Sequence, residues 1–271
     1  MPPLISAIVL NYRTGRDAWT CTEALLRQTI SDQLEVLIVD NHSDDDSIGY
    51  LRNRARADAR VRIIETRGNV GYGKGNNLGA GLAQGEFILI INPDNELEPR
   101  GLEMLVKKME SDSSIGILAP QLVHEDGTIR DSYRTFPTML DICIKRIPFL
   151  RGLFPKRMKR YLQHDQNAAL TRDVDWVAGA CFLIRRPFFL QLGGFDPRFF
   201  LFFEDTDLCR RCADAGKRVV YFPEVRAKDR KHRLSEGGVM ALLWKRTARI
   251  HLVSGVRYFW KWRGVAEGKK G

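Results

Sequence analysis

The chain of 271 residues is long enough for one large α/β domain or two small ones. Hydrophobic residues make up 44% and charged residues 28% of it, a globular composition that excludes disorder over most of the length. The formal net charge of +10 favours an anionic partner, namely nucleic acid, an acidic lipid surface or a phosphorylated substrate, although solubility alone can also account for it.

Cysteine usage and hydropathy indicate the compartment. The five cysteines follow no secretory signal and do not resemble a disulfide framework, so we expect a reducing cytosol. Cys209 and Cys212 form a C-x-x-C without a second pair or a histidine at zinc-finger spacing, which favours small helix-face residues over a zinc site. No apolar run approaches the roughly 18 residues needed to cross a bilayer, so we expect a protein that is soluble or lies on a membrane.

The first hundred residues alternate between strand and helix patterns. Short apolar runs predict strands at 4–10, 34–39, 61–64 and 87–91, and the segments between them have helical patterns. Nearly continuous apolar strands that alternate with helices indicate a parallel sheet covered on both faces. Right-handed crossovers then place the carboxyl ends of these strands along one edge of the sheet.

The pattern loosens after Pro120. We expect a hairpin at Asp126-Gly127, a strand over 174–184 and a helix over 204–215. Residues 139–162 are apolar and basic, and the tail at 242–263 is apolar, aromatic and basic at once.

Polar clusters begin directly after three of the predicted strands, at Asn11-Tyr12, at 40–46 and at 92–94. In open α/β sheets, ligands bind outside the carboxyl ends of the strands. The position of these clusters is therefore the first indication of a ligand site.

Six segments carry motifs whose order and spacing are more specific than any one of them alone. They read V-D-N-H-S-D-D-D-S at 39–47, G-N-V-G-Y-G-K-G-N-N-L-G at 68–79, N-P-D at 92–94, W-V-A-G-A at 176–180, F-F-E-D-T-D-L at 202–208 and K-H-R-L-S-E-G-G at 231–238. Together they resemble family 2 glycosyltransferases, in particular the bacterial rhamnosyltransferase-like branch, and the resemblance covers nearly the whole chain.

The resemblance implies an α/β fold of the GT-A type, with a mostly parallel central sheet, helices on both faces and a C-terminal helical extension. Residues 1–238 would then form the catalytic domain, with a nucleotide-sugar-binding half at about 1–120 and an acceptor half at about 121–238. A basic, aromatic, helical tail would follow at 239–271.

The resemblance also implies a donor site at the strand ends. Asp40 matches the family position whose carboxylate accepts a hydrogen bond from a pyrimidine base, and uracil and thymine present a ring N–H for it. The implied donor-binding residues are Asn11, Tyr12, Asp40, Asn41, Ser43, Gly71, Asn76, Asn77, Asn92, Trp176 and Gly179.

Several of these positions have a second interpretation. The glycines at 68–79 let the backbone approach a ligand, but they follow the third strand and so do not form a dinucleotide-binding fingerprint. Asp46 stands where the family usually has glycine, and Asp45 or Ser47 can cap the following helix. The segment at 176–180 also fits a buried strand with small residues.

For a metal ion, the resemblance points to Asp94 and His232, which would hold Mg²⁺ or Mn²⁺ against the donor diphosphate, with Asn92 as a further oxygen ligand. One or two protein carboxylates are enough for an ion that keeps waters and phosphates in its shell. The alternatives are a simple turn at 92–94 and a solvated loop histidine.

For catalysis, Asp205 matches the general base of the family, and Glu204 is the next candidate. The implied reaction is a single displacement with inversion at the anomeric carbon. Acidic residues at 204–207 can also serve only to complement the dipole at the start of a helix.

The implied donor is a dTDP- or UDP-sugar, with rhamnose as the sugar, and the implied acceptor is a lipid-linked or other glycan in cell-envelope polysaccharide synthesis. The aromatic and basic residues at 242–263 suit a helix on an anionic membrane surface, here the inner face of the cell membrane in the cytoplasm. The alternative is that the tail packs against the catalytic domain or against a second copy in a homo-oligomer.

Other classes stay open. A sugar-phosphate nucleotidyltransferase would carry a glycine-rich, basic loop after the first strand, where residues 11–15 read N-Y-R-T-G. A noncatalytic nucleotide-sugar-binding protein is compatible with every motif. A nucleic-acid-binding protein would explain the charge but not the three polar clusters, so we expect no nucleic-acid partner.

Overall fold

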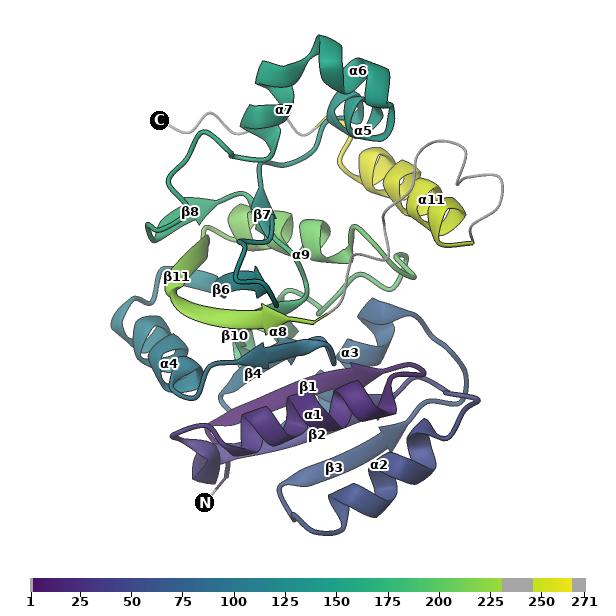
Figure 1. Ribbon diagram of the computed structural model, residues 1–271, viewed down its shortest axis with the longest axis vertical. Helices are drawn as coiled ribbons and strands as arrows, with labels where there is room; N and C mark the ends of the chain where they lie inside the picture. The colour runs from purple at the N-terminus through teal and green to yellow at the C-terminus, as the bar shows by residue number, and fades with distance from the viewer. Residues whose placement is uncertain (1, 231–245, 265–271) are drawn as a thin grey trace.

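The computed structural model describes residues 2–230 and 246–264 and has a nine-stranded mixed sheet at its centre (Figure 1). The strand order is β3-β2-β1-β4-β10-β6-β11-β5, and β8 pairs with β11. The strands are β1 (Ile5–Asn11), β2 (Leu34–Asp40), β3 (Val61–Glu65), β4 (Phe87–Ile91), β5 (Asn95–Leu97), β6 (Ile115–His124), β8 (Arg172–Val174), β10 (Cys181–Arg185) and β11 (Arg218–Asp229).

Three of these nine strands, β5, β8 and β10, pair antiparallel with their neighbours. The other six run in one common direction, namely β1, β2, β3, β4, β6 and β11. The expected mostly parallel sheet is therefore confirmed. In the parallel register Asn11 lies opposite Asp40, and β4 ends beside them on the other side of β1. This register brings the expected strand-end clusters to one edge.

Both faces of the sheet are covered, as the continuous apolar strands predict. Along β1, the side chains of Ile5, Ala7 and Val9 join one core cluster, and those of Ile8 and Leu10 join the other. The first cluster includes residues of α1 and α4, and the second includes residues of α3 and α9. These helices are α1 (Gly15–Leu26), α3 (Tyr72–Leu82), α4 (Gly101–Ser111) and α9 (Glu204–Asp214), with α2 (Ser47–Ala55), α8 (Arg186–Gln191) and the 3₁₀ turn Ser31–Gln33 as further elements.

The glycines of α3 allow the helix to lie close to the sheet. A Cβ added at Gly79 would lie 2.7 Å from Cγ2 of Ile8 and 3.1 Å from Cγ2 of Val39, and one added at Gly71 would collide with the carbonyl oxygen of Phe200. Gly71 also has a φ of +88°, which favours glycine. These glycines therefore allow close contacts within the protein, and the close approach to a ligand expected from the sequence stays a prediction.

The part of the chain after residue 120 differs from the sequence expectation in one place. The single strand expected at 174–184 is divided into β8, β9 (Trp176–Val177) and β10, because the chain bends at Asp175 and turns at Gly179-Ala180. The hairpin expected at Asp126-Gly127 is present, with a bridge between Val123 and Ile129.

Two helical parts lie at the end of the molecule farthest from β3 (Figure 1). The first consists of α5 (Met139–Arg146), α6 (Pro148–Leu153) and α7 (Pro155–Tyr161), next to the short ribbon of β7 (Tyr133–Arg134) and β9. The second is α11 (Arg246–Lys261), which confirms the expected helical extension. No helix among the described residues is long and apolar enough to span a bilayer. The boundary expected at residue 238 lies outside the described residues.

The packing of α3 gives a test of the fold. Replacing Gly79 with alanine places a methyl group against two stiff, β-branched side chains, so we expect the free energy of unfolding to fall by about 1–3 kcal/mol. Gly81→Ala, in the same helix but with nothing within 4 Å of the added Cβ, should instead stabilise the protein by about 0.4–1 kcal/mol. Urea unfolding measures both, and equal midpoints for the two variants would contradict this packing.

Candidate active site

At the carboxyl edge of the sheet, Asp40 is the centre of a hydrogen-bonded network. Its Oδ1 accepts hydrogen bonds from Asn11 Nδ2 at 2.6 Å and from Ser43 Oγ at 2.7 Å, and its Oδ2 accepts one from Ser43 N at 2.9 Å. The Asp40 side chain is buried, and Tyr12, the residue after β1, is exposed. Three of the expected donor residues thus form one rigid group at the ends of β1 and β2.

Asn41 joins this group to the glycine-rich segment. Its Nδ2 donates to Asn69 Oδ1 at 3.1 Å and to the carbonyl oxygen of Gly71 at 3.3 Å, and its Oδ1 accepts from Val70 N at 2.9 Å. The side chain therefore fixes the backbone at 69–71 beside the strand end.

The two asparagines of α3 behave differently. Asn77 donates to the carbonyl oxygen of Phe195 at 2.7 Å and accepts from the Phe195 N–H at 2.8 Å, so both ends of its amide hold a loop in place. Asn76 donates to the carbonyl oxygen of Tyr72 at 3.0 Å, and its buried Oδ1 has no hydrogen-bond partner among the described residues. Asn76 is thus the one with spare bonding capacity.

A chain of hydrogen bonds connects three parts of the sequence at Gly179. The Tyr72 hydroxyl donates to the carbonyl oxygen of Gly179 at 2.5 Å and lies 3.1 Å from Asn92 Oδ1. The N–H of Gly179 donates to Asp205 Oδ2 at 3.0 Å. The start of α3, the end of β4 and the start of α9 therefore meet here. Three residues expected to be functional, namely Asn92, Gly179 and Asp205, are brought together. Tyr72 was not selected from the sequence, although it lies inside the glycine-rich motif.

Asp205 lies in the first turn of α9 with both oxygens in hydrogen bonds, since Thr206 N also donates to its Oδ1 at 2.7 Å. Burial raises the pKa of Asp205 above its ordinary value of 3.8, and hydrogen bonds from the N–H groups of Gly179 and Thr206 limit the rise. A carboxylate in this environment is held in one orientation and is a stronger base than an exposed aspartate.

The neighbouring Glu204 has a contrasting environment. Its side chain is buried, and its Oε2 has no hydrogen-bond partner among the described residues. Burial, followed by the charge of Asp205, raises the pKa of Glu204 well above its ordinary value of 4.5. Of the two adjacent carboxyl groups, Glu204 is thus the one whose protonated form the fold favours more strongly.

The backbone that leads into this pair is strained. Phe202 and Phe203 have φ values of 69° and 68°, in the left-handed region that residues with a side chain rarely adopt. Each such residue costs on the order of 1–3 kcal/mol, and the conformation persists only where the surroundings hold it. Such positions are concentrated at functional sites.

Asp94 is the expected metal ligand. It follows β4, and its Oδ1 accepts from Asn95 Nδ2 at 3.0 Å. Burial and then the charge of Asp229, which ends β11 and is ion-paired with Arg130, raise the pKa of Asp94 above 3.8. A cation would relieve this repulsion, so the environment fits a bound divalent ion. Asp229 could not be selected from the sequence, because the pairing of β11 with β5 brings it beside Asn95.

The described residues test only part of the expected ligand set. Within residues 2–230 and 246–264, no cluster of three or more His, Cys, Asp or Glu side chains could hold a metal ion. The other expected ligand, His232, lies outside the described residues.

Trp176 is buried in the ribbon of β7 and β9. Its indole N–H donates to the carbonyl oxygen of Thr135 at 2.9 Å, and the guanidinium of Arg134 lies 5.2 Å from the centre of its ring. Trp176 therefore supports the turn that carries Gly179, three residues later.

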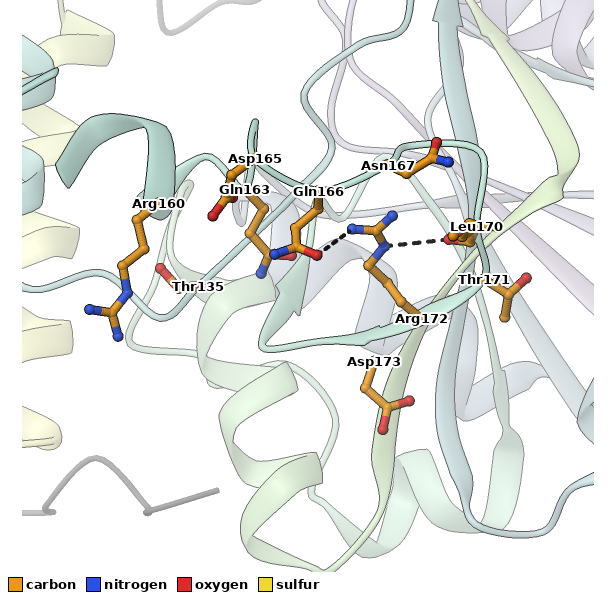
Figure 2. Close-up of a pocket in the computed structure, with 10 residues that line it drawn as sticks. All are labelled: Thr135, Arg160, Gln163, Asp165, Gln166, Asn167, Leu170, Thr171, Arg172 and Asp173. Atoms are coloured by element: carbon orange, nitrogen blue, oxygen red, sulfur yellow. Dashed lines mark hydrogen bonds between the residues drawn. The ribbon is translucent and has the colours of Figure 1, made fainter. Parts of the chain in front are cut away.

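A polar pocket is lined by Thr135 and by residues between 160 and 173 (Figure 2). Across it, Arg172 donates hydrogen bonds to Gln166 Oε1 and to the carbonyl oxygen of Leu170, both at 3.4 Å. The lining residues are Thr135, Arg160, Gln163, Asp165, Gln166, Asn167, Leu170, Thr171, Arg172 and Asp173. Amide, hydroxyl and guanidinium groups in this number are suited to a ligand rich in hydroxyl groups, such as a saccharide.

With this geometry established, comparisons with known proteins are informative. A model of the family described as Glycosyl transferase family 2 matches residues 6–193. The chain is 30% identical over 202 residues to the N-acetylglucosaminyl-diphospho-decaprenol L-rhamnosyltransferase of Mycobacterium tuberculosis, a match that covers 70% of this chain and 64% of that protein. It is 28% identical over 199 residues to the rhamnosyltransferase WbbL of Escherichia coli K12, covering 70% of each. The chain thus spans less than two thirds of the mycobacterial relative.

Solved structures share the fold. The structure of GalNAc-T7 with UDP, GalNAc and Mn²⁺ matches with a TM-score of 0.65 and 16% identity, over 88% of this chain and 45% of that one. Residues 1–349 of S. aureus TarS in complex with UDP-GlcNAc match with a TM-score of 0.57 and 16% identity, over 84% and 59% of the two chains. Both structures support the GT-A architecture expected from the sequence.

The buried Glu204 gives a pH-dependent prediction. In the unfolded chain this carboxyl ionises near 4.5, whereas the fold keeps it protonated to a higher pH. As the pH rises above 4.5, ionisation therefore favours the unfolded state, until the folded pKa is passed. Glu204→Gln does not ionise, so its free energy of unfolding relative to the natural protein should increase from pH 4 towards pH 8. Urea unfolding across this range measures the difference, and a difference that does not change with pH would contradict the assignment.

Proposed function

We propose that this chain, which belongs to glycosyl transferase family 2, transfers rhamnose with inversion from a pyrimidine nucleoside diphosphate to a lipid-linked or other glycan acceptor. The observation that supports this most strongly is the placement of Asp205, a buried, oriented carboxylate at the edge where the strand-end clusters meet. The choice of rhamnose rests on the names of the mycobacterial and E. coli relatives. Family membership also displaces the sugar-phosphate nucleotidyltransferase alternative.

The donor base is proposed to lie near Asp40. Each carboxylate oxygen can accept about two hydrogen bonds, and Oδ2 of Asp40 accepts one within the network. The remaining capacity suits the ring N–H of uracil or thymine. A pyrimidine donor is also consistent with the UDP present in two of the similar structures.

The donor diphosphate is proposed to lie near Asp94 and Asn92. Asp94 would hold Mg²⁺ or Mn²⁺, with waters and phosphate oxygens completing the shell and with His232 as a further candidate ligand. Such an ion supplies Lewis acidity, which stabilises negative charge on a departing diphosphate. Asn92 is oriented by Tyr72 and can donate its amide N–H to the same group.

Asp205 is proposed to act as the general base. It takes the proton from the acceptor hydroxyl while that oxygen bonds to the anomeric carbon, and the bond from this carbon to the diphosphate oxygen breaks. Because a diphosphate leaves without protonation, one carboxylate is enough, whereas glycosidases require two. The strongly raised pKa of the neighbouring Glu204 supports this division, since a protonated Glu204 adds no competing charge.

The acceptor is proposed to reach the site from a membrane surface, on the cytoplasmic side. The outward side chains of α11 include exposed apolar residues, namely Leu252, Val253, Val256 and Trp260. The sequence has no Asp or Glu at 142–163 or at 246–264, whereas basic residues are frequent in both. An apolar face with basic neighbours suits an anionic bilayer. The pocket of Figure 2 is a candidate contact for the saccharide part of the acceptor.

The role of Asp205 can be tested by Asp205→Asn, which keeps the shape but removes the basicity. We expect donor affinity to change little and the transfer rate to fall by about 10²–10⁴-fold. If Asp205 serves only the start of the helix, the variant should lose about 1 kcal/mol of stability and keep its activity. Glu204→Gln is the matched control. A near-normal transfer rate in Asp205→Asn together with an inactive Glu204→Gln would assign the base to Glu204.

The metal site predicts that dTDP or UDP binds more tightly with Mn²⁺ or Mg²⁺ than without. Asp94→Ala should remove most of this difference, because it removes the one carboxylate assigned to the ion. Isothermal calorimetry of the nucleoside diphosphate, with and without the cation, measures the effect in both proteins. Unchanged metal dependence in the variant would show that Asp94 does not hold the ion.

The membrane face predicts flotation with anionic vesicles that weakens at high salt. The double variant Val256→Glu/Trp260→Glu should float poorly, because it places two negative charges on the outward side of α11. The matched control is Leu78→Glu/Leu82→Glu, which makes the same change at two exposed apolar positions of α3. Equal flotation of the two variants would remove α11 from the membrane face.

A further inference from the structure

The inward side of α11 contacts the segment 196–207, which contains the strained turn and the catalytic carboxylate. Ser254 Oγ donates to the carbonyl oxygen of Leu201 at 2.8 Å, next to the Phe202-Phe203 turn. Lys261 Nζ donates to Asp196 Oδ2 at 2.8 Å. These polar contacts lie on the amino-terminal side of Asp205.

A second set of contacts lies on the other side of Asp205. Asp207, fully buried in the first turn of α9, accepts a hydrogen bond from Trp262 Nε1 at 2.9 Å and is ion-paired with Lys261 at 2.6 Å. Arg211 Nε forms a further ion pair with Asp207 Oδ2 at 2.8 Å. The C-terminal helix and the residue that follows it therefore hold the chain both before and after Asp205.

Aromatic packing fills the space between the two sets. The ring of Phe203 lies 5.3 Å from that of Tyr258 and 5.1 Å from that of His251, measured between ring centres. Tyr258 is fully buried, and Ile142 of α5 packs against the same cluster. Phe203 is thus held by α11 while its backbone is in the left-handed region.

From these contacts we infer that α11 is a positioning element for the transfer reaction, with Ser254 and Trp262 as positioning residues that act through Asp205. A pair of left-handed residues returns to ordinary conformations unless neighbours prevent it. The catalytic domain itself supplies the hydrogen bond from Tyr72 N to the carbonyl oxygen of Phe200, at 2.7 Å. Further contacts on either side of Asp205 come from α11 and Trp262, in addition to the ion pair between Arg211 and Asp207 within α9. This inference rests on the proposed function and adds to it a role for the tail that is independent of membrane binding.

Trp262→Phe tests the inference with little risk to folding, because it removes the N–H that binds Asp207 and keeps an aromatic ring beside Arg210. Trp260→Phe is the matched control, the same change on the exposed side of the helix. Ser254→Ala is an independent second variant. We expect Trp262→Phe combined with Ser254→Ala to lower kcat by up to about 10²-fold, as small misplacements of reacting groups do, with KM for donor and acceptor little changed.

Hydrogen exchange of the amides at 203–208, read by mass spectrometry, provides a measure that does not depend on activity. Exchange should be faster in the Trp262→Phe/Ser254→Ala variant and unchanged in Trp260→Phe, at equal thermal midpoints. Normal kcat in the double variant, or a loss of kcat that follows only a fall in the thermal midpoint, would overturn the inference. If the natural protein transfers no sugar, the proposed function fails. Exchange at 203–208 then tests only whether α11 holds this segment: unchanged exchange in the double variant would overturn the inference, and faster exchange would support its structural part.

Discussion

Both hydrogen-bonding groups of Gly179 hold the site together. Its N–H binds Asp205, and its carbonyl oxygen accepts from Tyr72, so one short turn fixes α9 and α3 relative to each other. Tyr72 also lies within hydrogen-bond distance of Asn92 at the end of β4. The proposed base, the glycine-rich segment and the proposed diphosphate site therefore share one connection. A Cβ added at Gly179 would lie 3.4 Å from Cβ of Asp205, at ordinary van der Waals distance, so the turn lies close against the start of α9.

The electrostatics of the site follow from this close packing. Carboxyl groups buried next to each other cannot all remain charged at low cost. Glu204 lacks hydrogen-bond donors among the described residues for one of its oxygens, and its pKa is raised well above 4.5, whereas the N–H groups of Gly179 and Thr206 limit the rise in the pKa of Asp205. At the second acidic position, Asp229 has Arg130 as a partner, and Asp94 is left with a raised pKa. A divalent cation that binds together with a nucleoside diphosphate would find a negatively charged partner in the Asp94 carboxylate.

The sequence predicted the parts of the site that depend on strand pattern alone. Continuous apolar strands followed by polar residues are sufficient to place Asn11, Asp40 and Asn92 at one sheet edge, and the register confirms the pairing of the first two. Contacts made through tertiary packing could not be predicted from the sequence. Asn77 hydrogen-bonds the backbone of Phe195, and Tyr72 hydrogen-bonds the carbonyl oxygen of Gly179. In both pairs the two residues are more than a hundred positions apart in the sequence. The surface that the tail contacts could not be predicted from the sequence either, since an aromatic and basic helix fits a membrane or a protein partner equally well. Only the structure shows that its inward face packs against Phe203.

The proposed reaction is a single displacement with one carboxylate as the base, and the anomeric configuration of its product distinguishes it from a double displacement. The configuration can be measured from the one-bond carbon–proton coupling at the anomeric carbon of the transferred sugar in an NMR spectrum. We expect a configuration opposite to that of the donor, because the acceptor oxygen attacks from the face opposite the leaving diphosphate. A product that retains the configuration of the donor would exclude the single displacement.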